Sequence, residues 1–565
     1  MRLPRFFVTL LVTLIWPGSI PAAFASAYNA HPKLVVVIVI DQFRGDYLER
    51  YRDQFGDGGF RMFLDHGANF TDCNYDYANT RTAPGHATLF TGSYTSGHGI
   101  VANEWWDPQK KKRVTSVEDD TTSLVGTGKT GPGASPHNLM SDTLGDELKL
   151  ATGGKARVFA ISLKDRAAVL PAGFSGDAAY WIDPKTGDWI TSTYYRADLP
   201  EWVRNFNGTR PSERRAEKYL NREWKDRDGN ILGSTAPRTA TNKDRNKDAE
   251  PAGFYQVVGS TPFANDYQLE FAKELVLYEK LGAGSATDLL VISLSANDIL
   301  GHQVGPDSPQ MRSMALELDR SLAEFFTFLG HQIGMANVWM ALSADHGIAP
   351  LPDFAKTLHL PAANLDAKAL REQINSLLAK KFAKKADYVP DLDYPVAWLD
   401  KDAFAGTLGA KDESAAEGEV GEAMKQMGFT GYFAKSQLAR GDIPPTEIGR
   451  RYAHSYSPEG GYYVIGIPIP FQVGITKGTD HASPFSYDTH VPLAFYGLAF
   501  QPGTYRTHAE PVDLAVTLAS LLGINAPTAA TGRVLTEALQ PHHSTAPSSV
   551  PPAMPAATPI SGGIQ

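Results

Sequence analysis

The 565-residue chain is poor in cysteine and has no long apolar segment after its first residues. Cys73 is the single cysteine, so an intramolecular disulfide is excluded, and stability must come from the core and from any bound metal. Beyond the N-terminus, no stretch offers the roughly 18 uninterrupted apolar residues that a membrane-spanning helix needs. We therefore expect a soluble mature protein in which Cys73 is a small buried hydrophobe.

Positive charge is also scarce. The sequence has 53 Lys and Arg against 62 Asp and Glu, which gives a formal net charge of −9. An acidic protein repels the phosphate backbone, so we expect no nucleic-acid surface. A site for an anionic substrate would have to be locally positive, and bound metal ions would supply that charge.

Residues 1–27 have the pattern of a secretory signal peptide. Arg2 and Arg5 precede an apolar run from Phe6 to Trp16 that is too short to span a bilayer, and small residues lie around Ala25. Removing this segment takes away two positive charges and leaves a mature charge of −11. The sequence predicts a periplasmic or secreted protein that ends in a disordered tail, residues 541–565, rich in Pro, Ala and Ser.

Short apolar runs predict buried strands of a mostly parallel sheet. They are Leu34–Ile40, Arg157–Leu163, Asp288–Ser293, Asn337–Ser343 and Val491–Tyr496. Amphipathic stretches between them, such as Met311–Leu329, predict helices, and the alternation indicates a doubly wound α/β fold. We expect one catalytic domain over residues 28–540, with inserted cap regions at about 173–263 and 349–472.

Ionisable residues follow the ends of these strands. Ligands of open α/β sheets bind beyond the carboxyl ends of the strands, so side chains at those ends should meet at one site. The residues placed in this way are Asp41, Lys164, Arg166, Asp298, Asp345 and His346.

A hydroxyl residue, Thr82, stands just before Ala83-Pro84-Gly85. Pro84 lacks a backbone N–H and suits the first turn of a helix, which would place Thr82 at or next to the N-cap. Unpaired N–H groups and the helix dipole favour an anion there, and an activated hydroxyl can attack an electrophile. An isolated Thr-x-Pro is usually an ordinary helix cap, but the acidic and histidine residues elsewhere in the chain favour a nucleophile.

The metal-ligating candidates form two groups by their chemistry. The first group contains Asp41, Asp345, His346 and the Thr82 oxygen. The second group contains Asp298, His302 and a late histidine. Asp298 and His302 are four residues apart, so one helical turn directs both toward the same ion. Mixed His and carboxylate ligands suit Zn²⁺ better than Ca²⁺ or Mg²⁺, and two ions about 4 Å apart would clamp an in-line displacement at phosphorus.

Two histidines compete for the last ligand position. His481 lies in a loop ahead of the Val491–Tyr496 strand and is free to reach over the sheet edge, whereas His490 is constrained by the strand that follows it. We expect His481 to be the ligand. His490 stays open as an alternative ligand or as a hydrogen-bond partner of one.

This order of residues resembles the alkaline phosphatase superfamily, and in particular the secreted bacterial alkaline phosphatases with a threonine nucleophile and a Lys-x-Arg pair. The similarity covers roughly residues 34–540 and includes Gly532–Leu539. The resemblance implies that Thr82 is the nucleophile, that Asn103 binds phosphate, and that Lys164 and Arg166 contact the phosphoryl oxygens. It also implies an alkaline pH optimum.

We therefore predict hydrolysis of small phosphate monoesters through a covalent phosphothreonine at a site with two Zn²⁺ per chain. One alternative is a phosphodiesterase or nucleotide pyrophosphatase of the same superfamily, whose resembling members lack the Lys-x-Arg pair. Another is a non-catalytic secreted protein that binds metal or phosphate. A sulfatase is disfavoured because its pattern needs Cys or Ser where Thr82 stands. No protein partner is evident, and a further structural divalent ion in the acidic insertions is left open.

Overall fold

The computed structural model describes residues 31–540 except 209, 211–212, 237–252 and 409–412. The predicted signal peptide and C-terminal tail lie outside the described residues. Among those residues, no helix has the length and apolar character that crossing a membrane requires.

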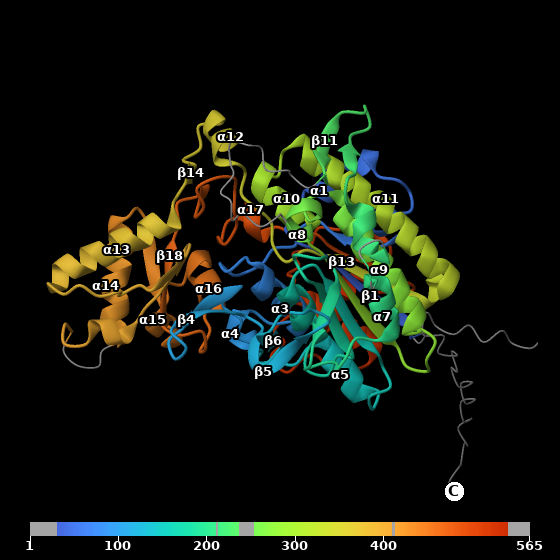
Figure 1. Ribbon diagram of the computed structural model, residues 1–565, viewed down its shortest axis with the longest axis horizontal. Coiled ribbons are helices and arrows are strands. Elements are labelled where there is room, and N and C mark those ends of the chain that lie inside the picture. Colours follow the sequence, from blue (N-terminus) through green and yellow to red (C-terminus); the bar gives the residue numbers. More distant parts are fainter. Residues whose placement is uncertain (1–30, 209, 211–212, 237–252, 409–412, 541–565) are drawn as a thin grey trace, which may run out of the picture.

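The core is one large sheet of mostly parallel strands (Figure 1). Strand β1, next to the centre of the sheet, reads LVVVIVI and is fully buried, as β-branched residues covered on both faces should be. The strand order is β21 (Gly503–Tyr505), β2 (Ala68–Phe70), β20 (Leu493–Tyr496), β13 (Val338–Ser343), β1 (Leu34–Ile40), β12 (Asp288–Leu294), β7 (Val158–Ser162), β8 (Ala178–Ile182), β9 (Trp189–Ser192), β5 (Glu118–Val125) and β6 (Pro132–Ala134). Strands β13, β1, β12, β7 and β8 are parallel neighbours, which confirms the predicted fold class.

Two details of the sheet differ from expectation. The run at Val491–Tyr496 forms β20, which pairs antiparallel with β13, because burial on both faces specifies an apolar sequence but not a strand direction. The segment 173–263, expected as an inserted cap, contributes β8 and β9 to the main sheet. Strand Ala178–Ile182 reads AAYWI and is fully buried, but the charged and turn-rich sequence around it made the whole segment resemble a surface insertion.

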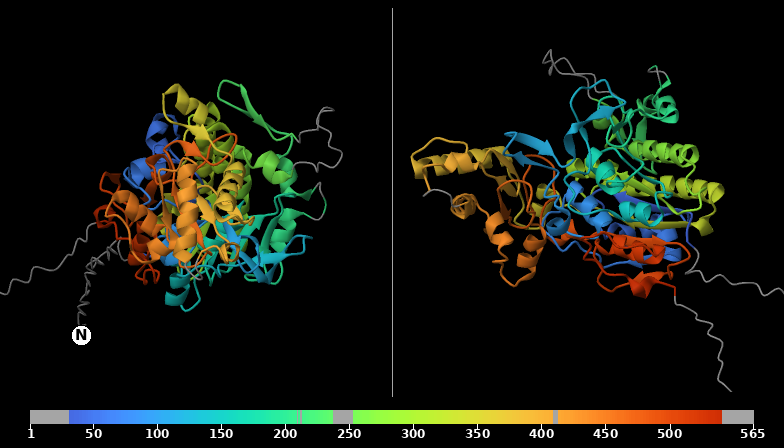
Figure 2. Two further views of the ribbon diagram at one scale, coloured as in Figure 1. Left: turned by 90° about the vertical axis from the view of Figure 1, so that its left-hand side faces the viewer. Right: turned by 90° about the horizontal axis from the view of Figure 1, so that it is seen from below.

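Helices cover both faces of the sheet (Figures 1 and 2). One group contains α3 (Thr82–Thr91), α5 (Leu144–Ala151), α6 (Asp165–Ala172) and α18 (Asp513–Leu522), which contact one another. The other contains α9 (Pro262–Tyr278), α10 (Ala296–Val304) and α11 (Pro309–Gln332). Helix α11 includes the predicted stretch Met311–Leu329, and most of the apolar side chains of this stretch are buried.

The register of the central strands brings their carboxyl ends together. Ile40 of β1 pairs with Leu294 of β12, Val39 with Ser343 of β13, and Ser293 of β12 with Ser162 of β7. The residues that follow these pairs, among them Asp41 and Lys164, therefore reach the same edge of the sheet, as predicted.

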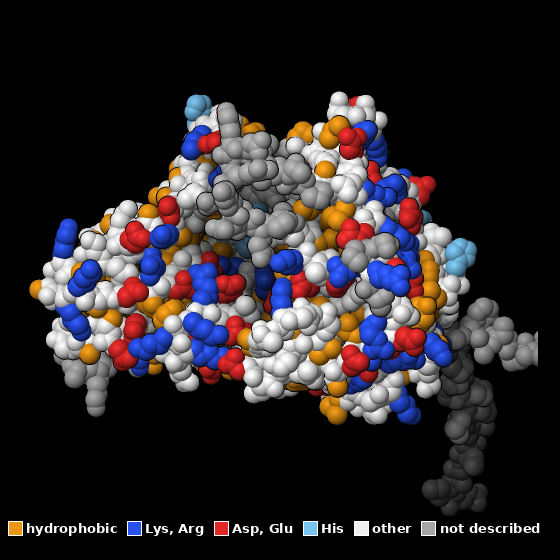
Figure 3. All heavy atoms as spheres, viewed as in Figure 1, with side chains coloured by type: hydrophobic (Ala, Val, Ile, Leu, Met, Phe, Trp, Pro, Cys, Tyr) orange, Lys and Arg blue, Asp and Glu red, His pale blue; other side chains and the backbone are white. Residues whose placement is uncertain are grey.

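The segment 349–472 builds most of a separate cap, which projects from the core at the left of Figures 1 and 3. Its sheet is antiparallel, with the order β15 (Asp391–Asp393), β16 (Val396–Trp398), β18 (Tyr463–Ile467) and β17 (Gly431–Ala434). Helices α13 (Ala367–Phe382) and α14 (Glu413–Gln426) pack together beside this sheet, and α16 (Glu447–His454) faces the core domain. Buried residues such as Ile374, Met424 and Val464 give the cap a hydrophobic core of its own.

A hairpin of the core domain leans on this cap (Figure 2, right). It consists of β3 (Glu104–Asp107) and β4 (Lys112–Thr115). Trp105 and Val114 of the hairpin share one buried cluster with Val396 and Trp398 of the cap. The cap is thus attached to the core by apolar packing as well as by its chain connections.

Candidate active site

Thr82 opens helix α3 and is almost fully buried, with 1 % of its surface exposed. Arg81 is the N-cap residue and has extended backbone angles, so the chain turns into the helix at Thr82, as the Pro84 pattern predicts. The Ala83 N–H, one of the groups without an intrahelical partner, donates to Asn103 Oδ1 at 2.8 Å. Asn103 therefore lies directly beside Thr82.

Asp41, Asp345 and His346 form a buried cluster at the ends of β1 and β13. Their facing side-chain atoms all lie within 4.8 Å of one another, and none of the three residues is exposed. Asp41 Oδ1, Asp345 Oδ2 and His346 Nε2 have no hydrogen-bond partner, although such buried polar atoms are normally paired. Two carboxylate oxygens and an imidazole nitrogen converging in this way are a donor set that fits a divalent cation such as Zn²⁺.

Asp298, His302 and His481 lie next to this cluster. Helix α10 places His302 Nε2 3.1 Å from Asp298 Oδ1, as their spacing predicts. His481 Nε2 is 3.9 Å from the same oxygen, and the His481 ring stacks on His346 with 3.8 Å between centroids. His346 therefore stands between the two predicted groups, and the facing atoms of Asp298, His346 and His481 also lie within 4.8 Å.

Each of the three histidines is oriented by a backbone carbonyl. The Nδ1 atoms of His302, His346 and His481 lie 2.8, 2.9 and 2.7 Å from carbonyl oxygens of Thr479, Gly347 and Thr80, respectively. A proton on Nδ1 leaves Nε2 as the lone-pair donor, and in all three residues Nε2 faces the carboxylates. This arrangement orients all three imidazoles as metal ligands need to be.

The pKa values follow from burial and from the carboxylates. Burial lowers the pKa of His346 and, more strongly, that of His481, which favours their neutral, ligating form. Burial acts in the same direction on His302, but the adjacent Asp298 outweighs it and raises the pKa of His302 to about 10. Burial and the neighbouring carboxylates raise the pKa of Asp41. A divalent cation would relieve this crowding of negative charge.

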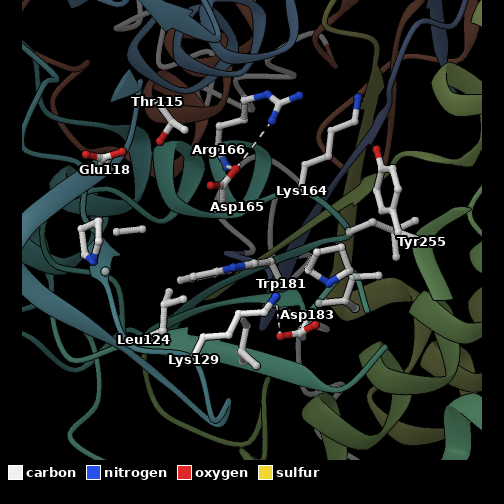
Figure 4. Close-up of a pocket in the computed structure, with 17 residues that line it drawn as sticks. Thr115, Glu118, Leu124, Lys129, Lys164, Asp165, Arg166, Trp181, Asp183 and Tyr255 are labelled. Carbon is white, nitrogen blue, oxygen red and sulfur yellow. Dashed lines mark hydrogen bonds and ion pairs between the residues drawn. The ribbon is translucent and has the colours of Figure 1, made fainter. Parts of the chain in front are cut away.

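Lys164 and Arg166 follow β7 and reach the same place. Lys164 Nζ lies 2.6 Å from Asp41 Oδ2, 2.5 Å from Asp298 Oδ2 and 3.5 Å from Thr82 Oγ1. Burial opposes the charge on Lys164, but the two carboxylates outweigh burial and raise the pKa of the ammonium. Figure 4 shows Lys164 and Arg166 extending in the same direction from the start of α6, at one side of a cavity that Trp181 also lines.

Several residues of the site were not singled out by the sequence. Gln42 donates from its backbone N–H to Asp345 and from Nε2 to Asp298, at 3.0 and 2.7 Å, so it fixes two carboxylates. His86 Nε2 lies 2.8 Å from Ser293 Oγ, and its Nδ1 lies 2.8 Å from the Thr82 carbonyl oxygen. The available signal for Gln42 was its position next to Asp41, and for His86 it was the position within the Thr82 segment.

Asp480 and Tyr255 were also missed. Asp480 Oδ1 lies 3.7 Å from both His302 Nδ1 and His481 Nε2, and these three residues form a further group that could hold a metal. Tyr255 belongs to the predicted insertion and stands beside Lys164 in Figure 4. The residues around Tyr255 give no sign of a functional role, because only the fold brings Tyr255 next to Lys164.

His490 lies elsewhere. Its Nε2 is 3.1 Å from the Thr71 carbonyl oxygen, and its ring packs against the backbone of Gly45. It lines a different cavity together with Arg44 and Phe354. The structure thus brings His481, and not His490, to the carboxylates.

Comparison with known proteins agrees with this geometry. Residues 35–415 match the model of the type I phosphodiesterase / nucleotide pyrophosphatase family. The chain is 33 % identical to the alkaline phosphatase PafA of Elizabethkingia meningoseptica, covering 94 % of this chain and 98 % of that protein. It is also 33 % identical to the alkaline phosphatase PhoV of Synechococcus elongatus, over 90 % and 94 % of the two chains. A Myroides odoratus protein named calcium-transporting ATPase is 35 % identical, over 92 % and 97 %.

Among solved structures, wild-type alkaline phosphatase PafA matches with a TM-score of 0.80 at 32 % identity, covering 90 % of this chain and 99 % of that one. Murine ectonucleotide pyrophosphatase / phosphodiesterase 5 matches with a TM-score of 0.51 at 16 % identity, a likeness of fold alone. The family model covers more than half of the chain, and relatives above 30 % identity align along nearly all of it. The chain therefore belongs to the type I phosphodiesterase / nucleotide pyrophosphatase family of the alkaline phosphatase superfamily.

Proposed function

We propose that this protein is an exported, metal-dependent alkaline phosphatase that hydrolyses small phosphate monoesters through a covalent phosphothreonine at Thr82. The observation that carries the proposal is the position of Lys164, whose Nζ lies 3.5 Å from Thr82 Oγ1 in a cluster of carboxylates and imidazoles. A monoester carries one negative charge more than a diester, and Lys164 with Arg166 would bind it. The names of the relatives PafA and PhoV support the same activity.

The metal ligands we assign are Asp41, Asp345, His346 and the Thr82 oxygen for one Zn²⁺, and Asp298, His302 and His481 for a second. When bound, these ions would lower the pKa of the Thr82 hydroxyl and stabilise negative charge on the oxygens of the substrate. The unpartnered atoms Asp41 Oδ1, Asp345 Oδ2 and His346 Nε2 support the first assignment.

The reaction then follows from the side chains of the site. Thr82 Oγ gives up its proton to solvent and attacks phosphorus as the alkoxide while the bond from phosphorus to the ester oxygen breaks, and the leaving alkoxide takes up a proton from solvent to become the alcohol. Water then attacks the phosphothreonine and the bond from phosphorus to Thr82 Oγ breaks. Thr82 Oγ regains a proton, and inorganic phosphate is released with the oxygen and the other proton of the water. The phosphoryl group has metaphosphate character in transit, so positioning and charge provide most of the catalysis. Asn103 and Arg166 would hold the non-bridging oxygens, and Lys164 would neutralise them.

The test compares p-nitrophenyl phosphate with bis-p-nitrophenyl phosphate, with and without a chelator. Preferred hydrolysis of the monoester that the chelator abolishes and Zn²⁺ restores is the expected result. Preference for the diester would make the protein a phosphodiesterase, and no turnover of either substrate by zinc-loaded protein would make it a binding protein. Either outcome would overturn the proposal.

A further inference from the structure

Arg81, the residue immediately before Thr82, is a buried arginine whose side chain is held by the cap. It is 5 % exposed. One terminal nitrogen donates to Asp393 Oδ2. The other donates to the carbonyl oxygens of Asp393 and Tyr394, at 3.1 and 2.7 Å. A guanidinium with both ends engaged in this way is fixed in direction as well as in position.

The residue before Arg81 connects the same segment to His481. The Thr80 carbonyl oxygen lies 2.7 Å from His481 Nδ1, and the Thr80 hydroxyl bonds to both the N–H and the carbonyl of Ser483, at 3.0 Å each. Three consecutive residues thus orient a histidine of the site, bind the cap and present the hydroxyl of Thr82.

Contacts other than those of Arg81 also join the cap to the core. Trp105 and Val114 pack on the cap, and Arg113 of β4 makes a two-pronged ion pair with Asp391 of β15, at 2.5 and 3.0 Å. Arg450 of α16 forms a similar pair with Asp76, at 2.6 and 3.0 Å. Loss of Arg81 should therefore leave the cap attached while it frees the backbone next to Thr82.

We propose that Arg81 is a positioning residue through which the cap holds the nucleophile in its reactive orientation. This inference rests on the proposed role of Thr82. The terminal nitrogens of Arg81 are occupied by the cap, so it acts through the backbone it anchors and not by binding phosphate. Small displacements of a reacting atom are costly, so a cap contact on the neighbouring residue can control the rate.

The chain offers a matched control for this idea. Arg81 and Arg113 both pair with strand β15 of the cap, through Asp393 and Asp391, but only Arg81 adjoins Thr82. Arg81→Gln should lower kcat for p-nitrophenyl phosphate roughly tenfold to a hundredfold with a smaller change in KM. Arg113→Gln should keep kcat within about twofold, because Arg113 does not adjoin the nucleophile and the apolar packing of Trp105 and Val114 on the cap remains. The kcat of Arg81→Lys, which can keep one of the bonds, should lie between that of Arg81→Gln and that of the unmodified protein.

Zinc content and the thermal midpoint, measured on the same samples, separate positioning from folding. The proposal expects the zinc content to match that of Arg113→Gln and both variants to unfold well above the assay temperature, while kcat differs. Equal kcat for the two glutamine variants, or a loss in Arg81→Gln that the missing zinc fully accounts for, would overturn it. If Arg81→Gln does not fold, Arg81→Lys decides, because a normal kcat in that variant also overturns the proposal. Full activity in Thr82→Ala would instead refute the proposed function itself.

Discussion

Lys164 Nζ lies 3.5 Å from Thr82 Oγ1, although the two residues belong to the starts of different helices. Helices α3 and α6 pack against each other on one face of the sheet, which holds their N-terminal ends side by side. A fixed cation is thereby set next to a hydroxyl at a helix start, where an incoming dianion would meet both.

The first prediction uses this relationship. Replacing Lys164 and Arg166 together by Ala should lower kcat/KM for p-nitrophenyl phosphate at least tenfold more than for its bis ester, because each lost charged hydrogen bond contributes about 1.5–3 kcal/mol. Lys129→Ala is the control, since Lys129 lines the same cavity but pairs with Asp183. Zinc content is measured in parallel, because Lys164 also contacts Asp41 and Asp298. Equal losses of kcat/KM for the two substrates would mean that Lys164 and Arg166 do not recognise the extra negative charge of the monoester.

The second prediction concerns Thr82. Thr82→Ala removes the nucleophile, so turnover should fall by several orders of magnitude while the thermal midpoint changes little. Thr82→Ser keeps a hydroxyl and should retain substantial activity. Steady-state rates and thermal melts of the three proteins provide the measurement. Near-normal turnover in Thr82→Ala would rule out the covalent route.

Much of the sheet and of the site could be predicted from the sequence because both depend on local patterns. Runs such as Leu34–Ile40 are apolar throughout, and a parallel sheet aligns their ends, so Asp41 and Lys164 had to reach one edge. Asp298 and His302 are four residues apart, so the formation of helix α10 was enough to bring their side chains together.

Other features depend on packing between distant segments and left no local signal. Arg81 and Asp393 are 312 positions apart, and no sequence pattern near either residue predicts their contact. The antiparallel direction of β20 depends on how the chain returns to the sheet after the cap. Tyr255 reaches Lys164 only because its predicted surface insertion contributes strands to the sheet.

A third prediction tests the junction between cap and core through pH. Burial opposes ionisation of Asp76, but His454 and Arg450 outweigh it and lower the pKa of this carboxyl to about 2, below its ordinary value of 3.8. A carboxyl with a depressed folded-state pKa stabilises the protein above its unfolded pKa, and this contribution is lost as the pH falls toward 2. Asp76→Asn should therefore cost about 2 kcal/mol of unfolding free energy at pH 7.

Urea unfolding of the two proteins between pH 7 and pH 3 checks this value. Asp76 also raises the pKa of His454, so the difference is constant only below about pH 5.5, where His454 is charged. From about pH 4 downward it should shrink, since the unmodified protein loses the contribution of Asp76 by protonation. Release of metal at low pH affects both proteins alike and cancels in the difference. A difference that grows between about pH 4 and pH 3 would contradict the assigned direction of the pKa shift of Asp76.

The last prediction decides between the two late histidines. His481 Nε2 faces Asp298 at 3.9 Å and its Nδ1 is held by the Thr80 carbonyl, whereas His490 Nε2 lies against the carbonyl of Thr71. His481→Ala removes one of three proposed ligands of the second ion, so bound zinc should drop from two ions toward one per chain, with loss of activity. His490→Ala should keep both ions and most of the activity. Atomic emission analysis of the purified variants gives the stoichiometry, and the reverse pattern would assign the ligand to His490.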